Sequence, residues 1–313
     1  MPIKLIRDKV KQQTQIETAI LSTLAFFSLY DLPISAKRLH ELLVRFAASQ
    51  EEIETALEIL VLDNKILRVG SLYSLKSWNL QTYQERQAEI SRKWEQIDSY
   101  FNWLAILPFV RQISVINSLA LGTADADSDI DFFVITKKRH LYLVRSMIIV
   151  LFRLLGVYKT RQKIKDKFCF GFFVDEDNLN FEHLLIQPSD PYFEFWLANM
   201  RPIIGGQQFW QLMQENSWLT DRFPNFKPMI RLSSIKKPGL WIRLFRNILE
   251  ILLFIPSFIL EPILRRIHIN HTFKLAENNS TSSTTIANPK MLKLHGYDVR
   301  AEVAQAYASL LEK

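Results

Sequence analysis

Two aspartates at the head of an apolar strand pattern limit the fold of this chain more than any other feature. Residues 117–136 read NSLALGTADADSDIDFFVIT, so Asp129 and Asp131 flank a single isoleucine before the run FFVIT. Aspartate is depleted in strand interiors. Because side chains two apart on a strand point to the same face, both carboxylates aim together while Ile130 points into the core behind them. The pattern predicts a buried strand that presents two acids to one site.

Two converging carboxylates repel each other, and one of their pKa values rises unless a cation separates them. Mg²⁺ typically binds one or two carboxylates together with substrate phosphates. Upstream, a turn at NSLALG would direct backbone N–H groups and the Ser118 hydroxyl toward a phosphate. Asn117 tolerates a left-handed backbone better than most residues. Asp125 and Asp127 are interpreted as turn residues, so the stretch predicts a Mg²⁺ site beside an anion site.

The order of a small residue, Ser, a short spacer and then Ser-Asp-apolar-Asp resembles the signature of the polymerase-β-like nucleotidyltransferase superfamily. Here the resemblance covers about residues 114–136, with eleven positions from Ser118 to Asp129. It implies a small mixed sheet with helices, and transfer of a nucleoside monophosphate from an NTP to an acceptor hydroxyl. It also implies that Ser118 contacts the outer phosphates, and that Asp129 and Asp131 hold Mg²⁺ ions. A third carboxylate on a later strand would complete a two-metal site.

The chain departs from this family pattern at two places. Asn117 stands where the family usually has glycine, and the third acid is not obvious. Glu182, within NFEHLLI, is favoured over Asp175, which follows the strand FCFGFFV. If neither acid reaches the metals, the protein binds nucleotides without transferring them. Arg145 in the following helix is a candidate triphosphate ligand, with an ordinary surface arginine as the alternative interpretation.

The first 78 residues predict a winged-helix-like module, with three helices followed by two short strands around Gly70. TQIE (14–17) and SQEE (49–52) are interpreted as capping boxes that open the first and third helices. The third helix begins EEIETALE, and residues 1–76 carry ten basic and nine acidic residues. DNA affinity comes largely from phosphate neutralisation, so we expect a packing or protein-interaction module and not a DNA reader.

The remaining chain predicts an α/β (α+β) protein whose central mixed sheet has the nucleotidyltransferase fold. The expected order is a helical connector over 79–107, the nucleotidyltransferase-fold core over 108–190 and a helical C-terminal region over 191–313. A polar linker at 276–289 is expected to be mobile. The single cysteine, Cys169, excludes a disulfide framework and a cysteine-based zinc site. No secretory signal is visible, which favours a cytoplasmic protein.

The net charge of +7 is concentrated in residues 227–274, which contain nine basic residues and two glutamates. Such a segment fits RNA or another polyanion, including an anionic membrane surface, although a solvated helix face is the simpler interpretation. Within it, residues 249–264 read LEILLFIPSFILEPIL, where Glu250 and Glu261 bracket ten uncharged residues. Because a span needs about 20 apolar residues, we expect a buried or surface-lying helix and no membrane span.

Two functions from different classes fit these observations. The first is a metal-dependent nucleotidyltransferase that moves an NMP from an NTP to an unknown acceptor, with Asp129, Asp131 and Glu182 as catalytic residues. In this reading Asn117, Ser118 and Arg145 bind the nucleotide, and Mg²⁺ is the cofactor. The second is a non-catalytic regulatory protein on the same fold, which binds nucleotides or nucleic acid.

Overall fold

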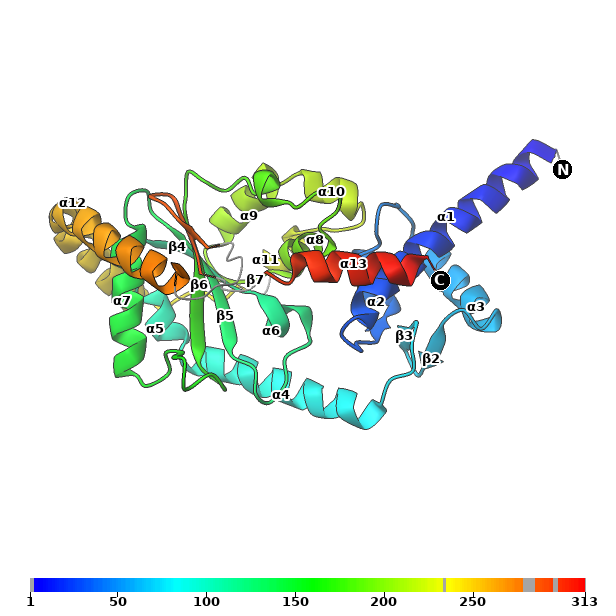
Figure 1. The fold of residues 1–313 in the computed structure, drawn as a ribbon, viewed down its shortest axis with the longest axis horizontal. Helices are drawn as coiled ribbons and strands as arrows, with labels where there is room; N and C mark the ends of the chain where they lie inside the picture. Colours follow the sequence, from blue (N-terminus) through cyan, green and yellow to red (C-terminus); the bar gives the residue numbers. More distant parts are fainter. Residues whose placement is uncertain (1–2, 233–234, 278–284, 295–297, 313) are drawn as a thin grey trace.

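The chain folds into a mixed helix and strand structure with two separate sheets (Figure 1). The computed structural model describes residues 3–232, 235–277, 285–294 and 298–312. A small sheet of order β1-β3-β2 and three helices form an N-terminal unit at one end of the molecule. Its elements are α1 (Ile3–Ser28), β1 (Ile34–Ser35), α2 (Ala36–Glu41), α3 (Gln50–Leu62), β2 (Leu67–Val69) and β3 (Leu72–Ser74).

Only one of the two expected capping boxes caps a helix. Ser49 accepts a hydrogen bond from the Glu52 backbone N–H, and the Glu52 carboxylate accepts one from the Ser49 N–H, so the box at α3 is confirmed. The box at Thr14 is wrong, because α1 begins at Ile3 and continues through this position. There the Thr14 carbonyl accepts a hydrogen bond from the Thr18 hydroxyl inside the helix. A capping pattern opens a helix only where the preceding residues are not already helical.

The second sheet has six strands in the order β7-β4-β5-β6-β9-β8. Its strands are β4 (Val110–Val115), β5 (Ile130–Thr136), β6 (Phe168–Asp175), β7 (Arg201–Ile204), β8 (Ile286–Ala287) and β9 (Met291–Lys293). The central pair β5 and β6 is parallel and the other pairs are antiparallel, so the expected mixed sheet is confirmed.

The C-terminal region is not purely helical, contrary to the sequence-based expectation. It supplies β7 to one edge of the sheet and β9 with β8 to the other. β8 lies within the segment expected to be a linker, of which residues 278–284 lie outside the described residues. These strands have two to four residues each: β7 pairs with β4, β9 pairs with β6, and β8 pairs with β9.

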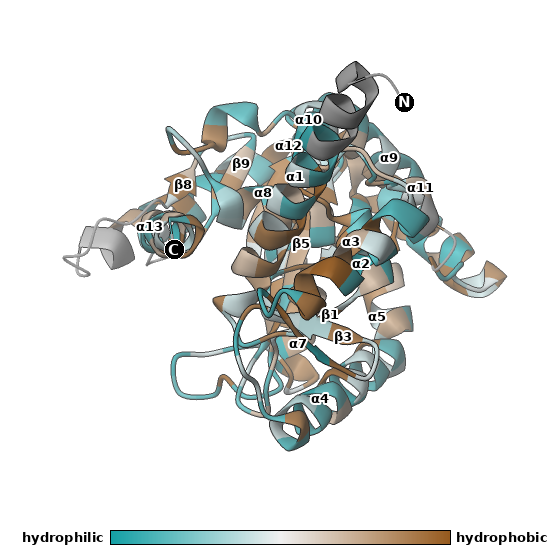
Figure 2. Cartoon of the chain, turned by 90° about the vertical axis from the view of Figure 1, so that its right-hand side faces the viewer, coloured by the Kyte–Doolittle hydropathy of each residue, from teal (hydrophilic) through white to brown (hydrophobic). Residues whose placement is uncertain are grey.

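Helices cover both faces of the six-stranded sheet (Figure 1). Before and between the central strands come α4 (Leu80–Ser99), α5 (Phe101–Ala105), α6 (Asn117–Leu121) and α7 (Leu141–Leu154). After β6 come the 3-10 turn η1 (Glu182–Leu184) and helices α8 (Pro191–Asn199), α9 (Gly206–Glu215), α10 (Trp218–Arg222), α11 (Met229–Leu232), α12 (Leu240–Glu277) and α13 (Arg300–Leu311). Figure 2 shows α4, the predicted connector, as a largely hydrophilic helix along one side.

The alternation along β5 sends its side chains into two different cores. Phe132 and Val134 are buried in one core together with residues of α5 and α7. Phe133 is buried in the other, where its ring lies 6.2 Å from Trp196 of α8. That second core continues into the N-terminal unit, since Phe26 of α1 stacks on Phe195 of α8 at 3.8 Å. Asp131, two residues before Phe133, therefore faces α8.

The apolar segment at 249–264 lies on the surface, inside the 38-residue helix α12. Of the two positions expected for it, buried or surface-lying, the structure shows the second. Among the described residues one helical stretch, Leu240–Phe273, is long and apolar enough to cross a membrane by length and composition.

Candidate metal and anion site

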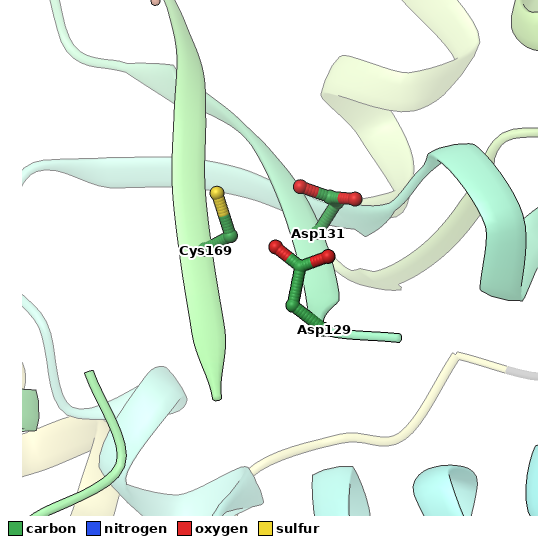
Figure 3. A group of neighbouring side chains, drawn as sticks. All are labelled: Asp129, Asp131 and Cys169. Carbon is green, nitrogen blue, oxygen red and sulfur yellow. The ribbon is translucent and has the colours of Figure 1, made fainter. Parts of the chain in front are cut away.

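Asp129, Asp131 and Cys169 come together on neighbouring strands (Figure 3). Ligand atoms of the three side chains all lie within 4.8 Å of one another, and no other such group of three occurs among the described residues. Asp131 pairs with Cys169 in the parallel ladder of β5 and β6. Paired residues of adjacent strands project from the same face, so the ladder itself places the thiol beside the carboxylate.

Asp131 is harder to ionise than an ordinary aspartate. Burial, and then the negative charge of Asp129, raise the pKa of Asp131 to about 6. A hydrogen bond from the Asn117 side chain and the charge of Lys159 counteract part of this rise. Burial, followed by the charge of Asp131, also raises the pKa of the Cys169 thiol well above its ordinary value. The site thus holds two carboxylates, which a hard cation would stabilise, beside a protonated thiol.

A lysine already neutralises one of the two acids. The Nζ of Lys159 lies 2.5 Å from Asp129 Oδ2. Lys159 directly follows Tyr158, which forms an isolated β-bridge with Phe168 of β6. Burial lowers the pKa of Lys159, but Cys169, Asp129 and Asp131 more than offset this and the pKa is raised. The ammonium group therefore competes with any metal ion for Asp129.

Asn117 connects the carboxylates to the neighbouring helix α8. Its backbone is left-handed, with φ 54°, as expected for an asparagine at this turn. Its Oδ1 accepts a hydrogen bond from Trp196 Nε1 at 2.8 Å, while its side chain also bonds to Asp131. Ser118 is half-buried next to it, and its carbonyl accepts the Thr123 N–H at 2.8 Å. The predicted turn is therefore present beside the acids, as a single helical turn with its loop.

The other two aspartates within residues 117–136, Asp125 and Asp127, behave as turn residues. Asp125 Oδ1 accepts hydrogen bonds from the backbone N–H groups of Asp127 and Ser128, at 3.1 and 2.9 Å. The bond from the Ser128 hydroxyl, followed by these N–H bonds, lowers the pKa of Asp125. The Asp127 side chain is 91% exposed.

The structure does not bring either expected third acid into the group. Glu182 is exposed in η1 and not on a strand. Asp175 pairs with Thr136 at the far end of β6, six residues or about 20 Å along the strand from Cys169. Arg145 is buried on α7, within the opposite layer. Burial lowers the pKa of its guanidinium group, and the charges of Tyr158 and Tyr142 offset only part of this lowering. It is not the surface arginine of the alternative interpretation.

Sequence reasoning missed a small cavity that is lined in part by Asn117. The cavity has a volume of about 180 Å³ and is walled by Tyr192, Trp196 and other aromatic side chains. Lys293 of β9 and Arg300 of α13 line it together with Asp298, and Arg300 forms ion pairs with Asp298 at 2.6 Å and Asp190 at 3.1 Å. Burial, and then the charge of Arg300, lower the pKa of Lys293. No local pattern marks these two residues, because Lys293 reaches the site through the pairing of β9 with β6 and Arg300 through its contacts with Leu184 and Asp190.

Removing Lys159 is expected to destabilise the metal-free protein and to make its stability depend on Mg²⁺. In Lys159→Gln, Asp129 loses its counter-charge and faces Asp131 directly, at a cost of about 1–2 kcal/mol. Urea unfolding in EDTA and in Mg²⁺ measures both effects. Lys165→Gln is the control, since Lys165 pairs only loosely, at 3.7 Å, with the exposed Asp127. Equal stability of Lys159→Gln with and without Mg²⁺ would contradict the assignment.

Comparison of the whole chain with models of protein families, with curated proteins and with solved structures found no significant match.

Proposed function

We propose that this protein binds a nucleoside triphosphate with one divalent cation, on a domain of the nucleotidyltransferase type, without transferring the nucleotide. The observation that carries the proposal is Cys169. On the strand beside the Asp129 and Asp131 pair, the residue in register with Asp131 is a thiol. A two-metal site holds its ions about 3.5–4 Å apart and needs a further carboxylate to hold the second ion. Two carboxylates fit one cation.

The residues present fit Mg²⁺ at this single position. Asp129 and Asp131 would hold the ion, whose charge would neutralise the crowded carboxylates and attract the phosphates. Lys159, released from Asp129 by the ion, would lie next to the same phosphates. This exchange of a lysine for a metal makes cation binding weaker than at a site whose carboxylates have no such partner.

The triphosphate is proposed to lie across Asn117 toward the cavity lined by Lys293 and Arg300. Asn117 links the acids to this cavity, since its side chain bonds to Asp131 and also lines the cavity with Lys293, Arg300 and Asp298. The cavity, at about 180 Å³, is smaller than a typical ligand pocket of about 300–1,000 Å³, so it would admit only part of the nucleotide. The remainder would lie in the open part of the site.

The N-terminal unit is proposed to be a winged-helix-type packing module. Its third helix, α3, exposes Glu51, Glu52, Glu54 and Glu58, and Arg68 of the wing pairs with Glu58. A phosphate backbone would be repelled by this surface. The opposite side of the unit shares its core with α8, next to the site. The unit is thus suited to supporting the nucleotide site and not to reading DNA.

The proposal is tested by nucleotide binding and nucleotide transfer in parallel. We expect a fluorescent NTP analogue to bind in Mg²⁺, with at least about tenfold weaker binding for the Asp129→Asn, Asp131→Asn double variant. Lys293→Met should weaken binding of the triphosphate more than that of the nucleoside. Asp127→Asn, at a fully solvated position, is the control.

Labelled NTPs incubated with a cell extract and the wild-type protein should label no acceptor. Labelling that the double variant abolishes would overturn the non-transferring part of the proposal and establish an enzyme. Absence of any Mg²⁺-dependent nucleotide binding would overturn the proposal as a whole.

A further inference from the structure

Helix α12 carries its apolar side chains on the outside of the protein. Among the described residues, 15 of the 26 large apolar side chains that are exposed belong to this helix. Trp241, Ile251 and Ile255 are 81%, 75% and 76% exposed. Monomeric soluble proteins rarely expose contiguous apolar patches larger than a few hundred Å². α12 lies at the end of the molecule opposite to the N-terminal unit (Figure 1).

Four polar residues along α12, Glu250, Ser257, Glu261 and His268, point inward, which reverses the usual amphipathic pattern. Glu250 Oε1 accepts the backbone N–H of Phe109 at 2.8 Å. About three turns further along, Glu261 Oε2 accepts the N–H of Leu143 at 2.8 Å, at the start of α7. His268 bonds to a hydroxyl of α7 at 2.8 Å. The two carboxylates are therefore consumed by the protein body, and they do not interrupt the apolar outer face.

Basic residues mark both ends of this outer face. The only charged residues between Arg246 and Arg265 are Glu250 and Glu261, which face inward. The apolar band between the arginines is eighteen residues, or about 27 Å, long. Arg243 and Arg266, just beyond this band, are exposed. The outer face thus combines an uncharged band with positive ends.

A basic cavity opens beside the same face. It has a volume of about 680 Å³ and lies between α12 and the ends of β5 and β6. Phe254 and Phe258 of α12 form its apolar wall, and Lys137 Nζ lies 5.1 Å from the centre of the Phe254 ring. Its charged lining consists of five basic and three acidic residues: Lys137, Lys138, Arg139, Arg265 and Lys290 with Asp175, Asp177 and Glu261. An apolar wall under a basic rim fits an acyl chain with an anionic headgroup.

We propose that α12 docks this protein on an anionic lipid bilayer, lying in the plane of the membrane interface. Ile251, Ile255 and their neighbours would enter the acyl boundary, while arginines at both ends reach the headgroups. A perpendicular, spanning position conflicts with the packing of α12. Its inner side is covered by the body along the whole band, so spanning would carry the Arg111 and Glu250 ion pair into hydrocarbon. The inference is independent of the proposed nucleotide site.

Other occupants fit the face less well. A second copy of the chain, packed through this face, would bring together the exposed arginines of two α12 helices, such as Arg243 and Arg266. RNA would bind the arginines but leave the isoleucine band in water. A membrane satisfies the apolar band and the charges at the same time, since anionic lipid attracts each nearby basic residue by about 1 kcal/mol.

Flotation of the full-length protein with lipid vesicles tests the proposal. We expect the wild type to float with phosphatidylcholine vesicles that contain phosphatidylglycerol, less at high salt, and more weakly with phosphatidylcholine alone. The triple variant Ile251→Gln, Ile255→Gln, Ile259→Gln places glutamine at three outward positions. It should reduce partition of the protein onto the vesicles at least about tenfold. Leu62→Gln with Leu154→Gln is the matched control, at side chains 79% and 82% exposed elsewhere.

Charge is tested separately from apolar contact. Arg243→Gln and Arg266→Gln should each weaken binding to the anionic vesicles about fivefold and leave binding to neutral vesicles unchanged. Equal flotation of the triple glutamine variant and the wild type would overturn the proposal. The proposal would also be overturned if the wild type formed a dimer without lipid while the triple variant stayed monomeric. Binding of the wild type to RNA but not to vesicles would overturn it as well. Vesicle-bound protein that alkaline carbonate cannot extract would overturn the in-plane position in favour of a span.

Discussion

Cys169→Asp is expected to raise the affinity of the protein for Mg²⁺ by at least about a hundredfold, because even outer partners of metal ligands change affinity 10–100-fold. The thiol and the two carboxylates already lie within 4.8 Å of one another, so a carboxylate at this position would join the same group. The parallel pairing with Asp131 holds it on the correct face. Aspartate and cysteine are similar in size, and the site is only partly buried. Calorimetric titration of Mg²⁺ into the metal-free protein measures the gain.

The matched control is Cys169→Asn, which has the shape of aspartate but no charge. It should leave the Mg²⁺ affinity within about threefold of wild type, since it supplies no anionic ligand. A similar gain from asparagine and aspartate would show that Cys169 acts through shape, and a lack of gain from aspartate would place the cation elsewhere. In Cys169→Asp, labelled NTPs test whether one added carboxylate is enough to produce nucleotide transfer.

The local chemistry of the site could be predicted from the sequence because it depends on residues close together in the chain. Asp129, just before β5, and Asp131 on it lie two residues apart and converge, and Asn117 takes the left-handed backbone that its short polar side chain favours. Asp125 closes a turn on its own neighbours. Each of these interactions spans fewer than about five residues, so no knowledge of the tertiary fold is needed.

The third position of the site could not be found from the sequence by looking for an acid. FCFGFFV alternates as a strand should, but only its register against β5 shows which residue meets Asp131. Lys159 has the same limitation, because it belongs to a basic loop and meets Asp129 only after β5 and β6 pair. The alternation rule assigns faces within one strand and carries no information on the register between strands.

The orientation of α12 illustrates the same limit for a helix. Glu250, Ser257, Glu261 and His268 recur at spacings of seven, four and seven, which places them on one face from sequence alone. The usual amphipathic rule assigns the polar face to solvent. Here that face is covered, because the carboxylates accept backbone N–H groups at the start of β4 and α7. Such partners are more than one hundred residues away and cannot be read from a local pattern.

Asp131→Asn is expected to stabilise the metal-free protein at neutral pH, while it abolishes the Mg²⁺ response. Burial and the charge of Asp129 raise the pKa of Asp131 to about 6 in the folded protein, whereas an unfolded aspartate has an ordinary pKa of about 3.9. Between these pH values the unfolded chain has lost a proton that the folded protein retains. This group therefore makes its full contribution to stability below about pH 4, and loses it as the pH rises toward 6.

The size of the effect follows from the shift, since each pKa unit corresponds to about 1.4 kcal/mol. Above pH 6, wild type should be about 2–3 kcal/mol less stable than Asp131→Asn, and the difference should vanish below about pH 4. Urea unfolding in EDTA across this range measures it, with Asp127→Asn as a solvated control. Added Mg²⁺ should raise the free energy of unfolding of wild type but not that of Asp131→Asn, because only wild type has both carboxylates to bind the ion. A variant that is less stable than wild type at pH 7 would show that the Asn117 hydrogen bond outweighs the repulsion between the acids.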